Sequence, residues 1–412
     1  MIALTHARLV DGTGDAPLDE ATIVLDGPRI YAAGRDVPLP DDEEAIELHG
    51  LTVLPGLIDV HVHFGGFTID DPDWKFTYWS TLPFFIDYAR GFKKRRTLAI
   101  ENGVTTVRSA GDNHPHIVQL RDRINRGRLV GPRIIAAGPI FTALGGHPAG
   151  TIYKDNRYIV EHATRQVETD TAARTEVKRL AAEGVDVIKA VYGDVNPFDL
   201  DRPVPKLDLP VLQAIVDEAH RQDLRSMVHV GNPRDALDAV LAGANSIEHG
   251  ILPGASRTQC SAELVDAMRD RGTYFVPTLS AAWAMKSTYP DALTHGMSWV
   301  RQMHQGGVRV ALGTDAGAPG VVIGKAAHME LELLVKSGLS PLEAIIAGTR
   351  NAAEVIGRVD ALGTIEPGKL ADLVVMSGDP LVDISASREV LLVIKNGTIV
   401  LNRLRSRHGH SH

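Results

Sequence analysis

The chain has 412 residues, of which 44% are hydrophobic and 23% charged, and its formal net charge is −8 with a pI near 6.1. This composition is typical of a soluble globular protein, and an acidic chain without a long basic run gives no support for a nucleic-acid or membrane partner. The single cysteine, Cys260, excludes an internal disulfide and a cysteine-rich zinc site.

The N-terminus has none of the features of a signal peptide, and no apolar run reaches the roughly 18 residues of a membrane span. We therefore expect a cytoplasmic protein.

Both ends of the chain carry strand-like patterns. Residues 1–54 alternate apolar and polar side chains in short runs broken by glycine-containing turns, and residues 362–403 do the same around Asn396-Gly397, a typical hairpin turn. Because a short meander buries little surface on its own, we expect the two ends to combine into one small β-sandwich domain. Residues 404–412 are expected to form a disordered tail.

The middle of the chain, residues 55–361, alternates short apolar segments with helical patterns. The predicted strands are Leu57–His63, Thr105–Ser109, Ile134–Ala137, Val185–Ala190, Ser226–Val230, Ser246–His249, Thr273–Pro277 and Val308–Thr314. The predicted helices include Thr171–Glu183, Leu209–Gln222, Pro233–Ala242, Ala262–Arg271 and Ala292–Gln305. This alternation predicts an α/β fold with a parallel sheet, most simply a closed (β/α)8 TIM-like barrel, and a doubly wound open sheet is the alternative.

The connection Gly65–Phe85 leaves the C-terminal end of the first of these strands and is rich in aromatic residues. Barrel enzymes build their active sites at that end, and long loops in compact domains are often functional. A substrate-facing lid and an ordinary packing loop are therefore equally consistent with the sequence.

Two histidines lie in the first predicted strand of the middle segment. Side chains alternate across a strand, so His61 and His63 point to the same side and form a ready pair of metal ligands. One or both could instead be core histidines, so the prediction of a metal site needs further ligands from elsewhere in the chain.

Further chemically active side chains occur where other predicted strands end. They are Lys189, His229, His249 and Asp315. In a barrel, all of them would meet His61 and His63 at the C-terminal face, and four imidazoles with a carboxylate suit Zn²⁺, Mn²⁺, Co²⁺ or Fe²⁺. Taken singly, His229 could be a satisfied core histidine and Asp315 could cap a turn.

Lys189 does not fit a metal site as an ammonium, which has only donors. A desolvated lysine has a lowered pKa, however, and its neutral amine can react with carbon dioxide to give a carbamate that bridges two cations. The alternative is a buried lysine paired with an acid such as Asp186.

These segments together resemble the amidohydrolase superfamily over nearly the full chain. The resemblance is carried by the run Leu54-Pro55-Gly56-Leu57-Ile58-Asp59-Val60-His61-Val62-His63, by Val187-Ile188-Lys189, by Ser246-Ile247-Glu248-His249-Gly250, by Gly313-Thr314-Asp315-Ala316-Gly317, and by residues 363–374. It implies a binuclear site for two divalent ions, zinc being the expected metal.

In that site, the resemblance gives His61, His63 and Asp315 to one ion and His229 and His249 to the other, with carboxylated Lys189 between them. It also implies attack by a hydroxide that bridges the two ions, with Asp315 moving the proton to the leaving group.

Among the subgroups, the chain resembles the prolidase-like branch and its imidazolonepropionase relatives. The matching residues imply that His147 and Tyr192 contact the substrate or its carbonyl oxygen, with a loop histidine and a packing tyrosine as the alternatives. Arg108 could bind a substrate carboxylate or form a structural ion pair. The family often has Asp after this arginine, whereas this chain has Ser109, which puts strict proline-dipeptide specificity in doubt.

The expected function is hydrolysis of an amide or peptide bond in an N-acyl amino acid or dipeptide with a bulky or aromatic group. A lactonase or phosphotriesterase could use the same site, and an inactive scaffold with this fold is the alternative from another class. The expected partner is a small-molecule substrate, and barrels of this size commonly form homo-oligomers.

Overall fold

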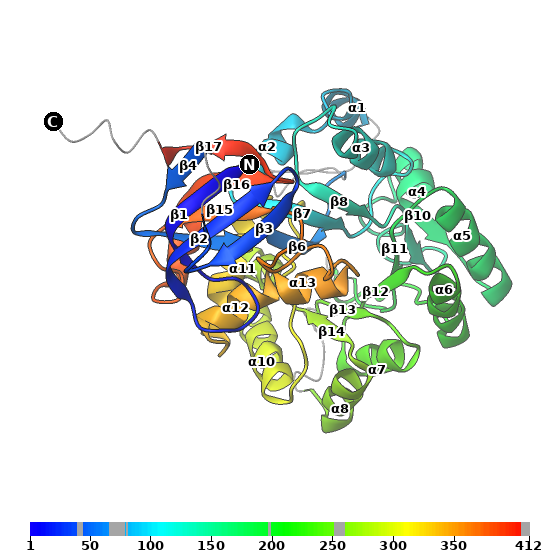
Figure 1. Cartoon of the computed structure of the whole chain (residues 1–412). Coiled ribbons are helices and arrows are strands. Elements are labelled where there is room, and N and C mark those ends of the chain that lie inside the picture. Colours follow the sequence, from blue (N-terminus) through cyan, green and yellow to red (C-terminus); the bar gives the residue numbers. More distant parts are fainter. Residues whose placement is uncertain (39–43, 66–78, 80, 197–198, 251–259, 405–412) are drawn as a thin grey trace.

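The computed structural model describes residues 1–38, 44–65, 79, 81–196, 199–250 and 260–404 (Figure 1). The strands from the two ends of the chain, drawn in blue and red, lie side by side and form one sheet. The middle of the chain forms parallel strands with helices on their outer side. In the part of the chain that the structure describes, no helix is long and apolar enough to span a membrane.

Strands from the two ends of the chain share one sheet. Their strands are β1 (Ile2–Leu9), β2 (Leu18–Asp26), β3 (Arg29–Gly34), β4 (Glu44–Glu47), β5 (Leu51–Pro55), β15 (Leu373–Ser377), β16 (Val390–Lys395) and β17 (Thr398–Asn402). They form an eight-stranded sheet in the order β17-β16-β15-β5-β1-β2-β3, with β4 paired to β1. The predicted turn at Asn396-Gly397 joins β16 and β17. That these strands form a small β-sandwich, as the sequence predicts, stays a prediction.

The alternating pattern of these strands places one set of side chains in a separate hydrophobic core. That core contains Leu4, Ile23, Val53, Leu373 and Leu392, all of them fully buried. Because the antiparallel pairing of β5 with β15 brings strands from both ends together, neither end could bury these side chains alone.

The middle of the chain contains parallel strands close to the predicted ones. They are β6 (Leu57–Val62), β7 (Val104–Ser109), β8 (Arg133–Ala136), β11 (Val187–Val191), β12 (Arg225–His229), β13 (Ser246–Glu248) and β14 (Tyr274–Val276). Two short strands that the sequence analysis did not identify, β9 (Ile140–Thr142) and β10 (Thr164–Gln166), extend the sheet beside β11.

Backbone hydrogen bonds link these strands into a closed circuit. β6, β7 and β8 pair in that order, and β11 to β14 pair in theirs. Asp186 N, just before β11, donates to Ala136 O at 2.7 Å and so links β8 to β11. On the other side, Phe275 N donates to Arg309 O and Val60 N donates to Leu312 O, both at 2.9 Å. The middle of the chain thus has the predicted mixed α/β content, and the closed barrel stays a prediction.

The eighth predicted strand, Val308–Thr314, forms only an isolated bridge at Val310. Its backbone bonds to β14 at one end and to β6 at the other, with a bond from Leu312 N to Ala347 O between them. The segment Val308–Thr314 therefore connects β14 to β6 by single backbone hydrogen bonds, without a continuous β-ladder to either strand.

The helices pack outside the parallel strands (Figure 1). They are α1 (Thr81–Ala89), α2 (Lys93–Glu101), α3 (His116–Asn125), α4 (Arg157–Ala163), α5 (Asp170–Ala182), α6 (Leu209–Arg221), α7 (Pro233–Leu241), α8 (Ala262–Arg271), α9 (Leu279–Ala284), α10 (Ala292–Gln305), α11 (Lys325–Lys336), α12 (Pro341–Ala347) and α13 (Arg350–Val355), with a 3-10 helix, η2, at Ile384–Arg388. Side-chain oxygens of Thr169, Asn232 and Ser261 cap the first turns of α5, α7 and α8.

Most of the aromatic connection Gly65–Phe85 lies outside the described residues, and so does the lid interpretation that rests on it. Its final part is helical, because α1 begins at Thr81. Phe84 on this helix is buried and its ring lies 5.7 Å from that of Phe92, so at this position the packing interpretation holds. The tail from residue 405 onward also lies outside the described residues.

Candidate metal centre

Three of the predicted ligands meet where β6 ends. His61 and His63 follow each other on one side of the strand, and Asp315 comes from the turn after the eighth segment. Asp315 Oδ1 lies 3.1 Å from His63 Nε2 and 3.5 Å from His61 Nε2. The backbone fixes this contact, because Asp315 N donates to His61 O at 2.8 Å and His63 N to Ala316 O at 2.8 Å.

The remaining histidines extend the cluster across the neighbouring strands. The ring of His249 lies 4.8 Å from that of His61 and 4.5 Å from that of His229, between centroids. The His147 ring, from the loop after β9, lies 5.5 Å from that of His229. One ligand atom each of His61, His249 and Asp315 lies within 4.8 Å of the others, a spacing that suits a single metal ion.

The imidazoles of this cluster are oriented by partners on their outer side. His61 Nδ1 lies 2.5 Å from Glu248 Oε2, and His63 Nδ1 donates to Gly111 O at 2.9 Å. His249 Nδ1 lies 2.8 Å from Thr278 Oγ1. Since carboxylates and carbonyls only accept, Nδ1 of His61 and Nδ1 of His63 each carry a proton, and the Nε2 atoms face Asp315. Burial alone would lower the pKa of His63, but the contact with the Asp315 carboxylate raises it.

Burial sets the charge of these groups. It holds the pKa of His61, His229 and His249 well below the ordinary histidine value, with further lowering from the neighbouring positive groups. The three imidazoles are therefore neutral, which is the form that binds metal ions. Burial alone would raise the pKa of Asp315, but His63 and His61 lower it, so that side chain is a carboxylate.

Lys189 projects into the cluster from β11 and has no acid bound to it. Its side chain is buried, and Nζ has no hydrogen-bond partner among the described residues. Burial lowers the pKa of its ammonium to about 8. The alternative pairing with Asp186 is not observed, because the carboxylate of Asp186 instead accepts from Arg121 Nη1 at 2.7 Å.

Two of the cluster residues have left-handed backbone. His249 has φ = 67° and Asp315 has φ = 61°, and Thr278, the partner of His249, has φ = 50°. Such conformations are uncommon for residues other than glycine and are concentrated at functional sites, where the surrounding structure imposes them. Here the backbone turns at the strand ends and so directs these side chains toward the cluster.

Arg108 lies in the interior beneath the cluster. Its side chain is fully buried, Nη2 lies 2.9 Å from Glu248 Oε1, and Nε donates to Val60 O at 2.6 Å. The structure thus shows the ion pair that the sequence left open, and it gives no support to binding of a substrate carboxylate by this arginine.

His147 and Tyr192 differ in their surroundings. Burial lowers the pKa of His147 to about 4, and its Nδ1 lies 2.8 Å from Thr151 Oγ1, so a neutral imidazole faces the cluster. The Tyr192 hydroxyl donates to Asp238 on α7 at 3.1 Å, away from the other predicted residues. A contact of Tyr192 with substrate stays a prediction.

Two buried acidic residues that organise the site, Glu248 and Asp59, were not among the predicted site residues. Glu248 orients His61, and Asp59 accepts from Thr314 Oγ1 at 2.6 Å and from Thr314 N at 3.1 Å, which ties β6 to the turn that carries Asp315. Both residues stand inside the motifs that carry the resemblance. The sequence signal that could have identified them is an acidic residue within a short, otherwise mostly apolar strand that is predicted to be buried.

The donor set fits divalent metal ions. Imidazoles, a carboxylate and a buried amine without a hydrogen-bond partner among the described residues come together, and the outer nitrogens of His61, His63 and His249 are occupied. Histidines that bind metal ions typically have such an outer partner, which orients the ring.

Comparisons with known proteins agree with this geometry. The model of the amidohydrolase family matches residues 52–400. The ochratoxinase of Aspergillus niger is 29% identical, over 92% of this chain and 82% of that protein. The imidazolonepropionase of Geobacillus thermodenitrificans is 24% identical, over 94% and 90%. A solved Xaa-Pro dipeptidase with methionine bound in its active site has a TM-score of 0.81 and 30% identity, and the match covers 97% of this chain and all of that one.

These matches confirm the resemblance seen in the sequence, including its prolidase-like and imidazolonepropionase-related character. Members of the family generally use divalent metal ions, as the donor set here would allow. The chain therefore belongs to the amidohydrolase family and is a hydrolase that acts on carbon–nitrogen bonds.

Proposed function

We propose that this enzyme hydrolyses the amide bond of an N-acyl amino acid or a dipeptide with a hydrophobic side chain, using two divalent metal ions, most simply zinc. The observation that carries the proposal is the gathering of outwardly anchored histidines around Asp315, together with a buried lysine whose Nζ has no hydrogen-bond partner in the part of the chain that the structure describes. In this proposal, the parallel strands that position these side chains form a (β/α)8 barrel, and the site lies at the C-terminal ends of the strands.

His61, His63 and Asp315 would hold one ion, and His229 and His249 the other. Lys189 would lie between them as a carbamate, since its amine is buried, unpartnered and depressed in pKa to about 8. When bound, two such ions lower the pKa of a water molecule and polarise the carbonyl of the substrate.

Asp315 is placed to move the proton. Its side chain is 18% exposed, whereas that of His61 is 1% exposed, so its carboxylate is open to the space where substrate would enter. It accepts the proton of the attacking water and delivers it to the leaving nitrogen. The contact of Oδ1 with His63 Nε2 holds the carboxylate in position meanwhile.

His147 is placed to assist at the carbonyl oxygen. His147 Nδ1 lies 2.8 Å from Thr151 Oγ1, which also lies 3.4 Å from Pro148 O. In the tautomer in which the Thr151 hydroxyl donates to Nδ1, the Nε2–H of His147 is the donor that would stabilise negative charge developing on the carbonyl oxygen. A pKa of about 4 keeps this imidazole neutral, and hence singly protonated, at neutral pH. Tyr192 is given no such role, because its hydroxyl is held by Asp238.

The substrate class is supported by the relatives. The solved Xaa-Pro dipeptidase binds methionine in its active site, which supports a substrate with an amino-acid part. The hydrophobic group that we propose for the rest of the substrate rests on the sequence alone, in which the stretch 74–85 is rich in aromatic residues.

A substrate panel tests this function. The zinc-loaded enzyme is assayed with N-acyl amino acids, dipeptides, lactones and aryl phosphotriesters, and we expect the highest kcat/KM for an amide with a hydrophobic group. Much faster cleavage of a lactone or phosphotriester would replace the proposal with that activity. A protein that binds almost no metal and turns over none of the panel would be an inactive scaffold.

A further inference from the structure

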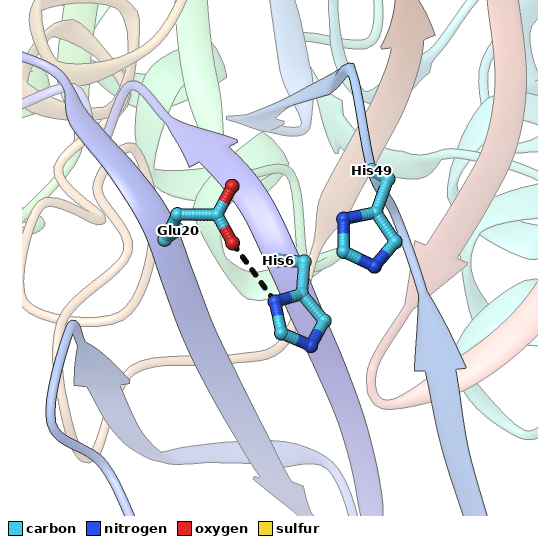
Figure 2. A group of neighbouring side chains, drawn as sticks. All are labelled: His6, Glu20 and His49. Carbon is cyan, nitrogen blue, oxygen red and sulfur yellow. Dashed lines mark hydrogen bonds and ion pairs between the residues drawn. The ribbon is translucent and has the colours of Figure 1, made fainter.

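A second group of metal-ligating side chains lies on the sheet formed by the two ends of the chain. It consists of His6 on β1, Glu20 on β2 and His49 in the turn before β5 (Figure 2). One ligand atom of each lies within 4.8 Å of the others, although all three side chains are exposed. Neither the mechanism nor the motifs of the family make use of these residues.

The three side chains already face one another. His6 Nδ1 lies 2.8 Å from Glu20 Oε2, and the His6 and His49 rings stack with centroids 4.2 Å apart and an angle of 14° between planes. Figure 2 shows the Glu20 carboxylate and both imidazoles around one shared space. Because an imidazole binds a metal ion through a nitrogen lone pair in the plane of its ring, one of the two stacked rings has to turn before both can bind the same ion, and both side chains are exposed enough to do so.

Irregular backbone places two of the ligands. His6 has φ = 57° and Glu20 has φ = 55°, both in the left-handed region that favours glycine. The pairing of β1 with β2 shifts register on both sides of Ala7, in the segments that contain these two residues. β-Bulges of this kind redirect side chains and are treated as designed features of a sheet, which motivates a functional interpretation.

The third ligand is held by the neighbouring strand. β4 pairs with the first half of β1 in parallel, with Thr5 opposite Glu47. The following turn is closed by bonds from Leu48 N to Thr5 O and from Leu51 N to Leu48 O, both 2.9 Å. His49 therefore lies in a turn that is bonded to β1 directly beside His6.

The surroundings favour a cation. A surface pocket of about 420 Å³ adjoins the group and is lined by His6, Glu20, Arg8, Asp19 and Asp379, among others. Arg8 pairs with both aspartates, so its positive charge offsets one of their two negative charges. Glu20 adds a further negative charge, and the excess of negative charge in the pocket favours a cation.

We propose that His6, Glu20 and His49 bind a divalent transition-metal ion, distinct from the catalytic ions, that ties β1, β2 and the turn before β5 together. Two imidazole nitrogens and one carboxylate oxygen suit Zn²⁺, and also Ni²⁺ or Cu²⁺, rather than Mg²⁺ or Ca²⁺. Water completes the coordination, because the group is open to solvent.

Zinc binding to matched variants tests the site. The parent carries Asn in place of His408, His410 and His412, because these tail histidines could bind zinc themselves. H6Q, H49Q and E20Q are made in this parent. The control is H304Q, which removes an imidazole 3.5 Å from the Glu343 carboxylate, outside the proposed site. Bound zinc per chain is measured after equilibrium dialysis, together with the melting temperature and amidase activity.

We expect H6Q and H49Q to bind about one zinc fewer than the parent and the control, with E20Q binding it at least tenfold more weakly. Zinc should raise the melting temperature of the parent more than that of H49Q. Activity should be unchanged in all of these variants. Equal zinc binding by H49Q and the parent would overturn the proposal. Loss of activity together with the zinc would also overturn it, since the ion would then belong to the catalytic centre.

Discussion

Nδ1 of His61 lies 2.5 Å from Oε2 of Glu248, and both side chains are fully buried. Glu248 in turn accepts from Arg108 Nη2 at 2.9 Å and from Ser246 Oγ at 2.5 Å. The carboxylate thus fixes the tautomer and the ring orientation of a predicted metal ligand, and Arg108 balances its charge. Outer partners of this kind commonly contribute 10–100-fold in metal affinity.

E248Q should therefore bind zinc about 10–100-fold more weakly than the wild type, because His61 loses its anionic partner. Competition with a chelator measures this affinity. The matched control is E183Q, which alters a histidine–glutamate pair away from the site, where His114 Nε2 lies 2.7 Å from Glu183 Oε2. If both variants hold zinc as tightly as the wild type, Glu248 does not position His61.

Replacement of Arg108 should lower stability rather than substrate affinity. In R108M, the buried carboxylate of Glu248 loses its cation, and breaking such a pair costs about 3–5 kcal/mol in the free energy of unfolding. Urea denaturation measures this loss, and R108K serves as the charge-conserving comparison. A normal stability with a KM raised only for carboxylate-bearing substrates would return Arg108 to a substrate-binding role.

His147 should affect catalysis without holding the metal. H147Q removes the proposed donor to the carbonyl oxygen, so we expect kcat to fall by about 10²–10³-fold while bound zinc stays at the wild-type level. Steady-state kinetics and metal analysis on the same preparation give both quantities. Loss of a metal ion from H147Q would instead identify His147 as a ligand.

Acid stability should depend on His328, which lies on α11 with its Nδ1 3.1 Å from Ser387 Oγ. Burial lowers the pKa of this imidazole to about 4 in the folded protein, below the ordinary value of 6.5. Folding therefore excludes a proton that the unfolded chain binds. The associated stability is complete above pH 6.5 and falls by up to about 3 kcal/mol as the pH drops to 4.

H328Q removes this titrating group. Its unfolding free energy should accordingly fall less steeply between pH 6.5 and pH 4 than that of the wild type, as measured by urea denaturation at a series of pH values. Identical pH dependence in the two proteins would show that His328 is protonated without penalty in the folded state.

Site residues that stand at the ends of predicted strands could be identified from the sequence. His61 and His63 share one side of β6, and parallel strands present their C-terminal ends at one edge, so the convergence with His249 and Asp315 could be predicted before any distance was known. That strands from the two ends would combine followed from a similar argument, because neither meander could bury its own core, whereas their antiparallel pairing was not predicted.

Other features could not be predicted because their causes lie far away in the chain. The partner of Arg108 is 140 residues distant in sequence, and a guanidinium suits a substrate carboxylate as well as Glu248. Asp59 looked like one polar residue in an apolar strand until its contact with Thr314 was known. The register shifts around Ala7, which place His6 and Glu20, leave no local pattern in the sequence.

The most direct test of the catalytic centre is the metal content of K189A, measured with bicarbonate present and in an H49Q background that lacks the proposed surface site. The parent should bind about two zinc ions per chain and hydrolyse its best amide substrate, whereas K189A should bind about one or fewer and lose at least 10²-fold in kcat/KM. K189A with the full metal content and full activity would show that Lys189 does not bridge the ions and would contradict the binuclear mechanism.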